Sequence, residues 1–305
     1  MSPASPVVAV GSCFADNITA KMRSCLWDAS VPLGVQFNPL SIADAISLCL
    51  GPETTNGFRN SLFGHGDLIH SWKFDSGFSA LSRKEAEDKF EMARDQFIDK
   101  LDKGRKLIIT FGTAYCYFKA SEPEEVVANC HKMPASLFVR RRVSAAEITQ
   151  RWRDIIGLLE ASFPGIEILM TVSPVRHVRD GLHENNLSKA TLLLAVDQLC
   201  SKIERCHYFP AYELLNDDLR DYRFYASDLV HPSEEAVEYI WERFCDGLID
   251  KKEIPLLKEG ESIMRRILHR HIAASEETIR QFNEETLRLY WKLKQKNPAV
   301  LEINV

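Results

Sequence analysis

The chain has 305 residues, of which 45% are hydrophobic and 27% are charged. This composition predicts a packed core and excludes disorder throughout, and the length suits one large α/β domain or two small ones. The 38 Lys and Arg against 43 Asp and Glu give a net charge of -5. That balance argues against nucleic acid as a partner, because nucleic-acid-binding domains carry a concentrated basic excess. We interpret the one basic run, residues 140–142, as a solvated surface turn.

The sequence shows no signal for secretion and no membrane span. No apolar stretch approaches the roughly 20 residues that a spanning helix needs, and the N-terminal segment lacks the basic and apolar regions of a secretory signal. We therefore expect a cytoplasmic protein without membrane contact. The eight Cys residues are scattered without a C-x-x-C pair, which favours neither a disulfide framework nor a zinc site. No cofactor and no metal is expected.

The first half of the chain contains two strand patterns and two helix patterns. An apolar run at residues 7–10 predicts a strand that ends at Gly11, and residues 106–111 (KLIITF) predict a second. The helix after the first strand has one apolar face, formed by Phe14, Ile18 and Met22. Residues 83–103 form a charged amphipathic pattern whose inner stripe consists of Phe90, Met92, Phe97, Ile98 and Leu101.

The second half continues the alternation. Residues 144–163 predict a helix that opens with Ser144 and Glu147 in a capping-box pattern. A strand is expected at residues 166–172, a helix at 187–200 and a short strand at 207–209. A further helix should have Pro232 in its first turn. Its inner face consists of Val237, Ile240, Trp241 and Phe244.

Strands that alternate with helices, and whose apolar runs are continuous, predict a parallel sheet covered on both faces. About four or five strands favour an open, doubly wound sheet in a three-layer α/β/α sandwich over an eight-stranded barrel. We assign this domain to residues 1–250 and a C-terminal helical extension to residues 251–305. The extension is charged with sparse apolar positions, so it either packs back on the domain or contacts a partner.

A serine and a cysteine directly follow the first strand. In open α/β sheets the functional crevice lies at the carboxyl ends of the strands, and a helix begins at once after Gly11. At a helix N-terminus, unpaired backbone N–H groups favour developing negative charge, which suits Ser12 as nucleophile and as oxyanion donor. An N-cap is the commoner role of such a serine. Cys13 is a second candidate nucleophile, ranked lower because cysteine is often buried.

An Asp-x-x-His pair lies far downstream, in Asp228 and His231. A carboxylate three residues before an imidazole can fold back to hold Nδ1–H, which leaves Nε2 free to take a proton from a hydroxyl. Pro232 disfavours helical backbone at His231, so we expect the pair in a turn. The alternatives are that Asp228 caps the following helix and that His231 is a buried structural histidine.

Several stretches of the chain match family motifs in sequence order. They are residues 11–15 (GSCFA), 37–41 (FNPLS), 111–114 (FGTA), 129–132 (NCHK), 171–177 (TVSPVRH), 188–190 (SKA), 218–225 (DLRDYRFY) and 228–233 (DLVHPS). Over roughly residues 7–245 the chain resembles the GSCFA family, which is similar to the SGNH or GDSL hydrolases. The resemblance implies an SGNH-hydrolase-like α/β/α fold, with Ser12 as nucleophile, His231 as general base and acid, and Asp228 as the residue that orients the imidazole.

The resemblance departs from the SGNH pattern at the oxyanion hole. Those enzymes complete the hole with a Gly after the second strand and an Asn in a block after the third strand. Here Ala114 stands in place of the Asn, and losing one such donor costs about 3 to 4 kcal/mol of transition-state stabilisation. Asn129 is the best substitute for the missing side-chain donor, and the Ser12 backbone N–H is a second candidate donor. Gly34 is the candidate backbone donor, or an ordinary turn glycine.

Two further residues are candidates for substrate binding. His131, in the Asn-Cys-His-Lys stretch, could contact an anionic or acyl substrate from the side, or belong to an exposed, solvated loop. Arg176 follows the strand at residues 166–172 and could clamp a carboxylate or phosphate. The alternative for Arg176 is an ion pair with Asp180 or Glu184.

These features predict a serine esterase or acyl hydrolase, either an O-acetyl esterase or an acyltransferase, acting on a small ester or an acylated carbohydrate. The alternative is a non-catalytic or regulatory binding protein on the same fold, because the oxyanion hole is incomplete. A metal-dependent phosphoesterase built on Asp228, His231 and His131 ranks last, since the histidines lack ligand spacing.

Overall fold

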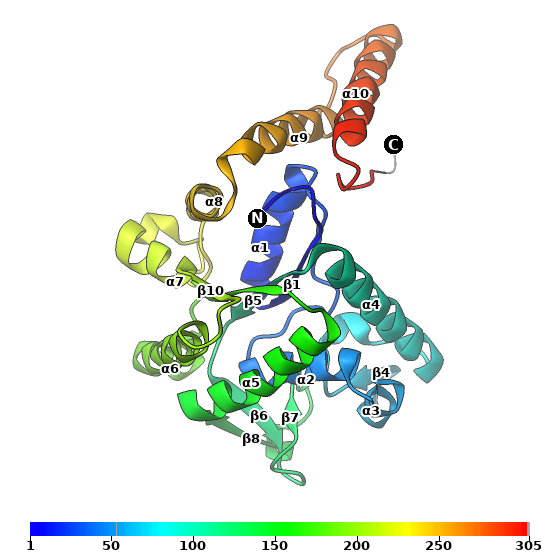
Figure 1. Cartoon of the computed structure of the whole chain (residues 1–305). Coiled ribbons are helices and arrows are strands. Elements are labelled where there is room, and N and C mark those ends of the chain that lie inside the picture. Colours follow the sequence, from blue (N-terminus) through cyan, green and yellow to red (C-terminus); the bar gives the residue numbers. More distant parts are fainter. Residues whose placement is uncertain (53, 304–305) are drawn as a thin grey trace.

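A five-stranded parallel sheet forms the centre of the computed structural model, which describes residues 1–52 and 54–303 (Figure 1). The strand order is β10-β9-β5-β1-β2, and every neighbouring pair is parallel. The strands are β1 (Val7–Gly11), β2 (Ala29–Ser30), β5 (Lys106–Phe111), β9 (Glu167–Val172) and β10 (Cys206–Phe209). The predicted doubly wound parallel sheet is confirmed.

Helices cover both faces of this sheet and complete three layers (Figure 1). One face packs on α1 (Cys13–Ser24) and α8 (Glu234–Leu248), and the other packs on α2 (Pro39–Leu50), α4 (Arg83–Gly104), α5 (Ala145–Ser162) and α6 (Leu182–Cys200). Alternate residues of β5 divide between the two cores, with Ile108 on the α1 side and Leu107 and Ile109 on the other. This two-sided burial explains why the strands are continuous apolar runs.

The strand order reverses between β1 and β5. Strand β2 lies on one side of β1 in the sheet, and the later strands β5, β9 and β10 follow one another on the other side of β1. Such a reversal opens a crevice at the carboxyl ends of the two strands. The backbones of β1 and β5 approach very closely there, since a Cβ on Gly11 would lie 2.1 Å from the Thr110 carbonyl oxygen and the Gly11 φ is +138°. Only glycine fits this position without strain.

Smaller elements are inserted between the main ones. They include the hairpin β3 (Leu62–His65) and β4 (Leu68–Ser71), the helices α3 (Thr54–Asn60) and α7 (Ala211–Glu213), and an antiparallel sheet of β6 (Tyr115–Lys119), β7 (Val126–Val127) and β8 (Phe138–Arg142). Short 3-10 turns lie at Ser76–Phe78, Ala135–Leu137, Val178–Asp180, Tyr222–Phe224 and Lys251–Glu253, and a π-helical turn at Leu214–Leu219.

The basic run at residues 140–142 is not a turn, so its interpretation from the sequence was wrong. These residues belong to β8 and pair with β6. Arg140 lies over the ring of Tyr115 at 4.0 Å, and Arg141 lies over that of Phe118 at 4.5 Å. Stacking of arginine on aromatic neighbours across the strands stabilises the pairing and makes a charged strand possible.

The predicted helices are found, with three corrections. The capping box of Ser144 and Glu147 begins α5 as predicted. Met92 does not belong to the inner stripe of α4, because it is 74% exposed. Helix α6 begins at Leu182 instead of at residue 187. Pro232 lies outside α8, since Ser233 is the N-cap and accepts from the Ala236 N–H, so Asp228 does not cap this helix.

The C-terminal region forms two helices that pack back on the sheet-bearing part of the chain. Helix α9 (Ile254–Ile267) contacts α1, and α10 (Glu276–Lys296) contacts α9. A small core joins Leu26, at the end of α1, to Ile263, Tyr290 and Leu293. The last described residues return to the same place, because the Leu301 N–H donates to the Leu26 carbonyl at 2.8 Å.

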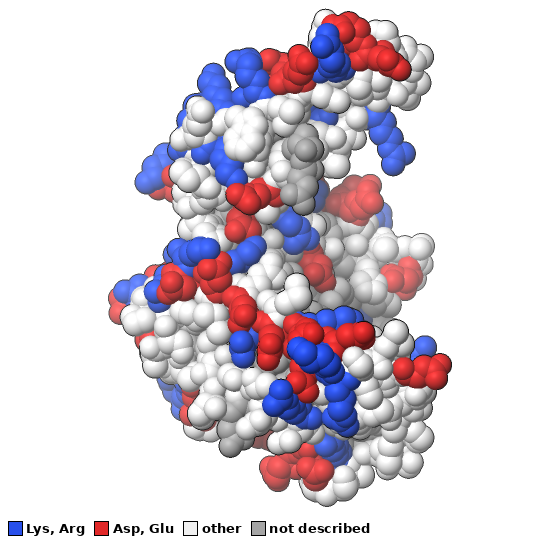
Figure 2. All heavy atoms as spheres, turned by 90° about the vertical axis from the view of Figure 1, so that its right-hand side faces the viewer, with Lys and Arg blue, Asp and Glu red and all other residues white. Residues whose placement is uncertain are grey.

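The surface carries mixed charge. Figure 2 shows one face on which acidic and basic side chains are interspersed among wide uncharged areas, and no single sign covers it. Among the described residues, no helix combines the length and the apolar character that crossing a bilayer requires.

The contact between α9 and α1 depends on Gly260. A Cβ there would lie 2.1 Å from the Cys25 carbonyl oxygen, whereas a Cβ on Gly157 in α5 would meet nothing within 4 Å. We expect Gly260→Ala to lower the free energy of unfolding by about 1–3 kcal/mol because the helices must separate. Gly157→Ala is the matched control and should raise it by roughly 0.5–1 kcal/mol. Urea unfolding measures both, and an equal effect of the two substitutions would contradict the close contact.

Candidate active site

Ser12 lies at the reversal of strand order and caps α1. Its Oγ accepts from the Phe14 N–H at 3.4 Å, and its own N–H donates to the Thr110 carbonyl at 3.1 Å. The residue is 1% exposed. The serine therefore has the N-cap role that the sequence allowed. The same position puts its oxygen at the positive end of the α1 dipole, where negative charge is stabilised.

Cys13 follows Ser12 directly, but its thiol is poorly suited to act as a nucleophile. Burial, followed by the charge of Asp16, raises the pKa of its thiol. A raised pKa lowers the fraction of thiolate, which is the nucleophilic form of cysteine.

Asp228 and His231 form a hydrogen-bonded pair in a turn before α8. The Asp228 Oδ2 lies 2.7 Å from His231 Nδ1, and Oδ1 accepts the N–H groups of Val230 and His231 at 2.9 and 3.0 Å. The His231 N–H and ring, followed by the Val230 N–H, lower the pKa of this carboxyl to about 2. Asp228 is therefore ionised at neutral pH. Both side chains are about half exposed, so His231 is not a buried structural histidine.

The segment after β9 connects to this turn. The Arg176 N–H donates to the Val230 carbonyl at 3.1 Å. The Arg176 guanidinium lies over the Tyr225 ring at 4.0 Å and over the Tyr222 ring at 5.5 Å. Its suggested ion-pair partners are taken elsewhere: Asp180 pairs with Arg140, and Glu184 pairs with Arg142. Arg176 therefore stacks on aromatic rings beside the Asp-x-x-His turn.

His177 is a residue of this edge to which the sequence analysis assigned no role. Its Nε2 is buried without a hydrogen-bond partner. That nitrogen and the Ser12 Cβ both lie within 3.3 Å of the point that a Cβ on Gly112 would occupy. The Phe37 ring stands edge-on to the imidazole at 5.8 Å. One signal was available: His177 follows β9 at the same edge as Ser12, one residue after the arginine that was singled out.

The charge state of His177 is fixed by its surroundings. Burial, followed by the positive charges of Lys189, Arg140 and His231, lowers its pKa from 6.5 to about 3. The imidazole is therefore neutral at neutral pH.

One face of α6 holds the strand ends in place through three buried side chains. The Asn185 Oδ1 accepts the His177 N–H at 2.9 Å, and the Ser188 Oγ accepts the Ala114 N–H at 2.8 Å. The Lys189 Nζ donates to the carbonyls of Gly112 and Ser173, both at 2.6 Å. A spacing of three and four residues places all three side chains on one side of the helix.

The backbone groups named as oxyanion donors have other partners. The Ser12 N–H donates to Thr110, and the Gly34 N–H donates to the Val31 carbonyl at 3.4 Å. Gly34 is also a turn glycine, with a φ of +69° and no room for a Cβ beside Asp75.

Asn129 and His131 form a local turn beside the β3–β4 hairpin. The Asn129 Oδ1 accepts the His131 N–H at 2.7 Å. The His131 Nε2 lies 2.8 Å from the Ser71 carbonyl, and its ring packs 4.5 Å from that of His70. His131 is buried, which lowers its pKa, so it is not part of an exposed loop.

The described contacts therefore gather some of the predicted residues and not others. The segment after β9 links Arg176 to the turn of Asp228 and His231, and Ser12 lies beside Gly112 near His177 of the same segment. Asn129 and His131 instead belong to the turn beside the hairpin. Within the described residues no hydrogen bond joins Ser12 to His231. The relay between these two residues stays a prediction. No group of three or more His, Cys, Asp or Glu in the described part of the chain is arranged to hold a metal ion.

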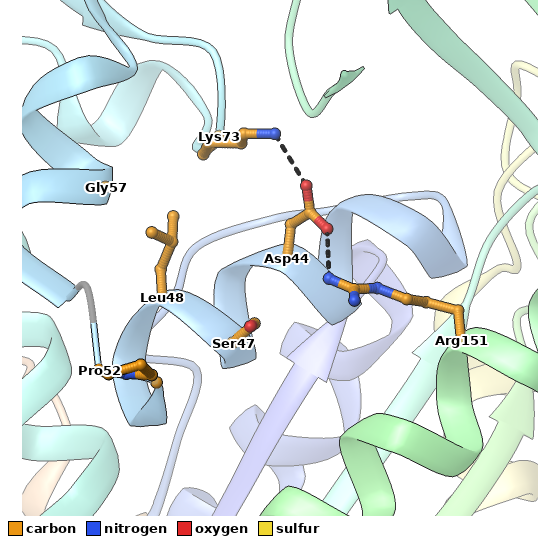
Figure 3. A pocket seen from close by; sticks show the side chains of 8 residues that line it. Asp44, Ser47, Leu48, Pro52, Gly57, Lys73 and Arg151 are labelled. Atoms are coloured by element: carbon orange, nitrogen blue, oxygen red, sulfur yellow. Dashed lines mark hydrogen bonds and ion pairs between the residues drawn. The ribbon is translucent and has the colours of Figure 1, made fainter. Parts of the chain in front are cut away.

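A hollow of about 260 Å³ lies elsewhere, between α2, α3 and α5. Figure 3 shows Lys73 and Arg151 pointing from two sides at Asp44, each with a nitrogen 2.8 Å from a carboxylate oxygen. None of Ser12, His177 and His231 lines it. Ion pairs of Asp44 with Lys73 and Arg151 cross this hollow, which lies apart from the edge of the sheet where Ser12 is found.

The fold and these contacts define a doubly wound α/β/α protein with polar side chains gathered where the strand order reverses. The sequence profile of the GSCFA family matches residues 6–244. The chain belongs to this family, which confirms the resemblance seen in its motifs.

Comparison with other proteins adds little beyond the family. No curated protein matches the chain. A solved structure of a carbohydrate esterase family 3 from Talaromyces cellulolyticus is 10% identical, with a TM-score of 0.34, and the match covers 84% of this chain and 99% of that chain. A structure of an acetyl esterase mutant with acetate ion is 11% identical, with a TM-score of 0.32 and the same coverage. Similarities this distant carry no argument about the chemistry of this chain.

The two carbonyl contacts of Lys189 give a stability prediction. Lys189→Met leaves the Gly112 and Ser173 carbonyls without their donor, and a buried unpaired polar group costs about 1–3 kcal/mol. We expect urea unfolding to show a loss of that order, with no comparable loss in the control Lys202→Met, whose side chain is exposed. Equal stability of both variants would contradict a structural role for Lys189.

The burial of Lys189 also predicts how the stability of the protein depends on pH. Burial lowers the pKa of Lys189 from 10.5 to about 7. Between these values the unfolded chain binds one proton more than the folded chain, so stability rises with pH in this window. The stability of the wild type relative to Lys189→Met should therefore increase from pH 7 toward pH 10.5. A difference that stays constant over this range would contradict the lowered pKa.

Proposed function

We propose that this protein is a serine esterase that acts through an acyl-enzyme at Ser12, with His231 as general base and acid and Asp228 as the residue that orients it. The observation that carries the proposal is the contact between the segment after β9 and the Asp-x-x-His turn, through Arg176 and Val230. This contact links the imidazole–carboxylate pair to the edge of the sheet where Ser12 caps α1.

The ionised Asp228 suits this role. It accepts from His231 Nδ1 and so fixes the tautomer whose Nε2 accepts a proton. As the Ser12 Oγ bonds to the ester carbonyl carbon, its hydrogen passes to His231 Nε2 and the carbonyl π electrons move to the oxygen. When the tetrahedral intermediate collapses, the bond to the alcohol oxygen breaks. His231 then gives its proton to the departing alcohol.

The second half of the reaction releases the acyl group. Water attacks the acyl carbon while His231 accepts one of its protons, and collapse of this intermediate returns the hydrogen to Ser12 and frees a carboxylic acid. An alcohol in place of water gives acyl transfer by the same steps. We propose small esters, including O-acetyl groups of carbohydrates, as substrates.

A binding or regulatory role is the second candidate function. It is favoured by the backbone N–H groups of Ser12 and Gly34, which already have carbonyl partners, and by the absence of a Ser12–His231 hydrogen bond in the described contacts. A fluorophosphonate probe separates the two functions, because it labels only a serine that has been activated as a nucleophile.

The nucleophile is tested by Ser12→Ala with an activated acetyl ester as substrate. We expect turnover to disappear and the far-UV circular dichroism to stay unchanged. Cys13→Ala is the matched control, since it removes the neighbouring nucleophile and should retain activity. Undiminished hydrolysis by Ser12→Ala would end the proposal, and loss of activity in the Cys13 variant alone would transfer the role to the thiol.

The orienting residue is tested by Asp228→Asn. Because the pKa of Asp228 is about 2, the carboxylate is present throughout the range in which an imidazole titrates. The amide holds His231 in the wrong tautomer, so we expect kcat to fall by about 10⁴-fold, as the same substitution does in a Ser-His-Asp serine protease. Steady-state kinetics measure it, and Asp246→Asn, an exposed carboxylate on α8, is the control. An unchanged kcat would show that His231 needs no carboxylate partner.

A further inference from the structure

The proposed reaction needs a donor for its oxyanion, and the residues named from the sequence do not supply a free one. The N–H groups of Ser12 and Gly34 have carbonyl partners, and the Ala114 N–H donates to Ser188. The Gly112 N–H donates to the Phe37 carbonyl at 2.8 Å. The Asn129 side chain forms a turn with His131 beside the hairpin.

His177 is a half-buried residue at this edge, and its Nε2 is buried without a hydrogen-bond partner. Its Nε2 would lie 3.1 Å from a Cβ on Gly112, and the Ser12 Cβ would lie 3.3 Å from the same atom. The Phe37 carbonyl oxygen lies 2.9 Å from that point, so the space beside Gly112 is narrow and is bounded by the serine, the imidazole nitrogen and this carbonyl. An acyl carbon bound to Ser12 Oγ would hold its oxygen within reach of this space.

We propose that the Nε2–H of His177 donates a hydrogen bond to the oxyanion that forms when Ser12 attacks an ester. This assignment rests on the proposed esterase function and fills the position for which Ala114 offers no side chain. His231 keeps the proton-transfer role, so the two histidines divide donation and base catalysis between them.

The environment of His177 suits a donor and not a base. Burial is the main cause that lowers the pKa of the His177 ring. The positive charges of Lys189 from α6, Arg140 from β8 and His231 from the Asp-x-x-His turn lower it further, so the ring stays neutral. A neutral imidazole with a very low pKa is a poor proton acceptor but a sound hydrogen-bond donor, as in enzymes that use neutral histidine as an electrophile.

One contact fixes the main chain of His177 and another packs against its ring. The Asn185 Oδ1 accepts the His177 N–H at 2.9 Å, and the Phe37 ring packs edge-on to the imidazole. A donor that is fixed before the reaction does not have to reorganise as charge develops, which is the condition for strong oxyanion stabilisation.

The direct test uses phenylboronic acid and ¹⁵N NMR of the full chain. Boron accepts the Ser12 Oγ and becomes a tetrahedral anion, whose oxygen takes the place of the oxyanion. We expect the His177 Nε2–H proton to move downfield on adduct formation, and no such movement in Ser12→Ala. Formation of the adduct, seen by ¹¹B NMR, without a change at His177 would overturn this inference and leave the serine nucleophile standing. Failure of the adduct to form would instead overturn the proposed function.

Kinetics provide the second test. We expect His177→Ala to lower kcat for an activated acetyl ester by about 10²–10³-fold with little change in KM. His177→Gln should recover part of the loss, because its amide also donates, and the acid limb of the pH profile should stay in place. His207→Gln is the control, since that histidine pairs with Glu167 at the start of β9 and far from Ser12. An unchanged kcat in His177→Ala, or a loss as complete as that of Ser12→Ala without recovery by Gln, would contradict the donor role.

Discussion

The two hydrogen bonds of Lys189 are the interaction on which the candidate site depends. They tie together the carbonyls of Gly112 and Ser173, which end neighbouring strands of the sheet. Parallel strands leave their terminal carbonyls pointing at one edge without partners, and a buried amine from α6 satisfies two of them at once. Asn185 and Ser188 extend this fixation to His177 and Ala114. The helix thus sets the spacing of the segments from which any chemistry at this edge must come.

Most of the fold could be predicted from the sequence because it follows from local patterns. Continuous apolar runs gave β1, β5 and β9, and the capping box gave the start of α5. The failures have physical causes. The arginines of β8 are stabilised by aromatic rings on a neighbouring strand, a contact that no local pattern reveals. Met92 has the spacing of an inner residue but lies at the edge of the apolar face, where solvent reaches it.

In the candidate site, too, the features set by local sequence could be predicted and those set by tertiary packing could not. The Asp228–His231 contact is local, so a spacing of three residues was enough to predict it. The states of the other candidates depend mostly on long-range contacts: the Ser12 N–H donates to Thr110 of another strand, and His131 is buried against the hairpin. The Gly34 N–H instead donates within its own turn, to Val31. His177 has no motif of its own. Its significance arises only from the packing that brings Gly112, Ser12 and the end of β9 together.

The C-terminal helices bear on the same site from a distance. Helix α1 carries Ser12 at one end, and at the other end Leu26 packs on Ile263 and accepts the Leu301 N–H. Residues from the last part of the chain therefore pack against the C-terminal end of α1. A fusion or tag attached there adds mass at the end of α1 opposite the proposed nucleophile. Immobilising or labelling the molecule near residue 301 therefore touches the packing at the far end of the helix that Ser12 caps.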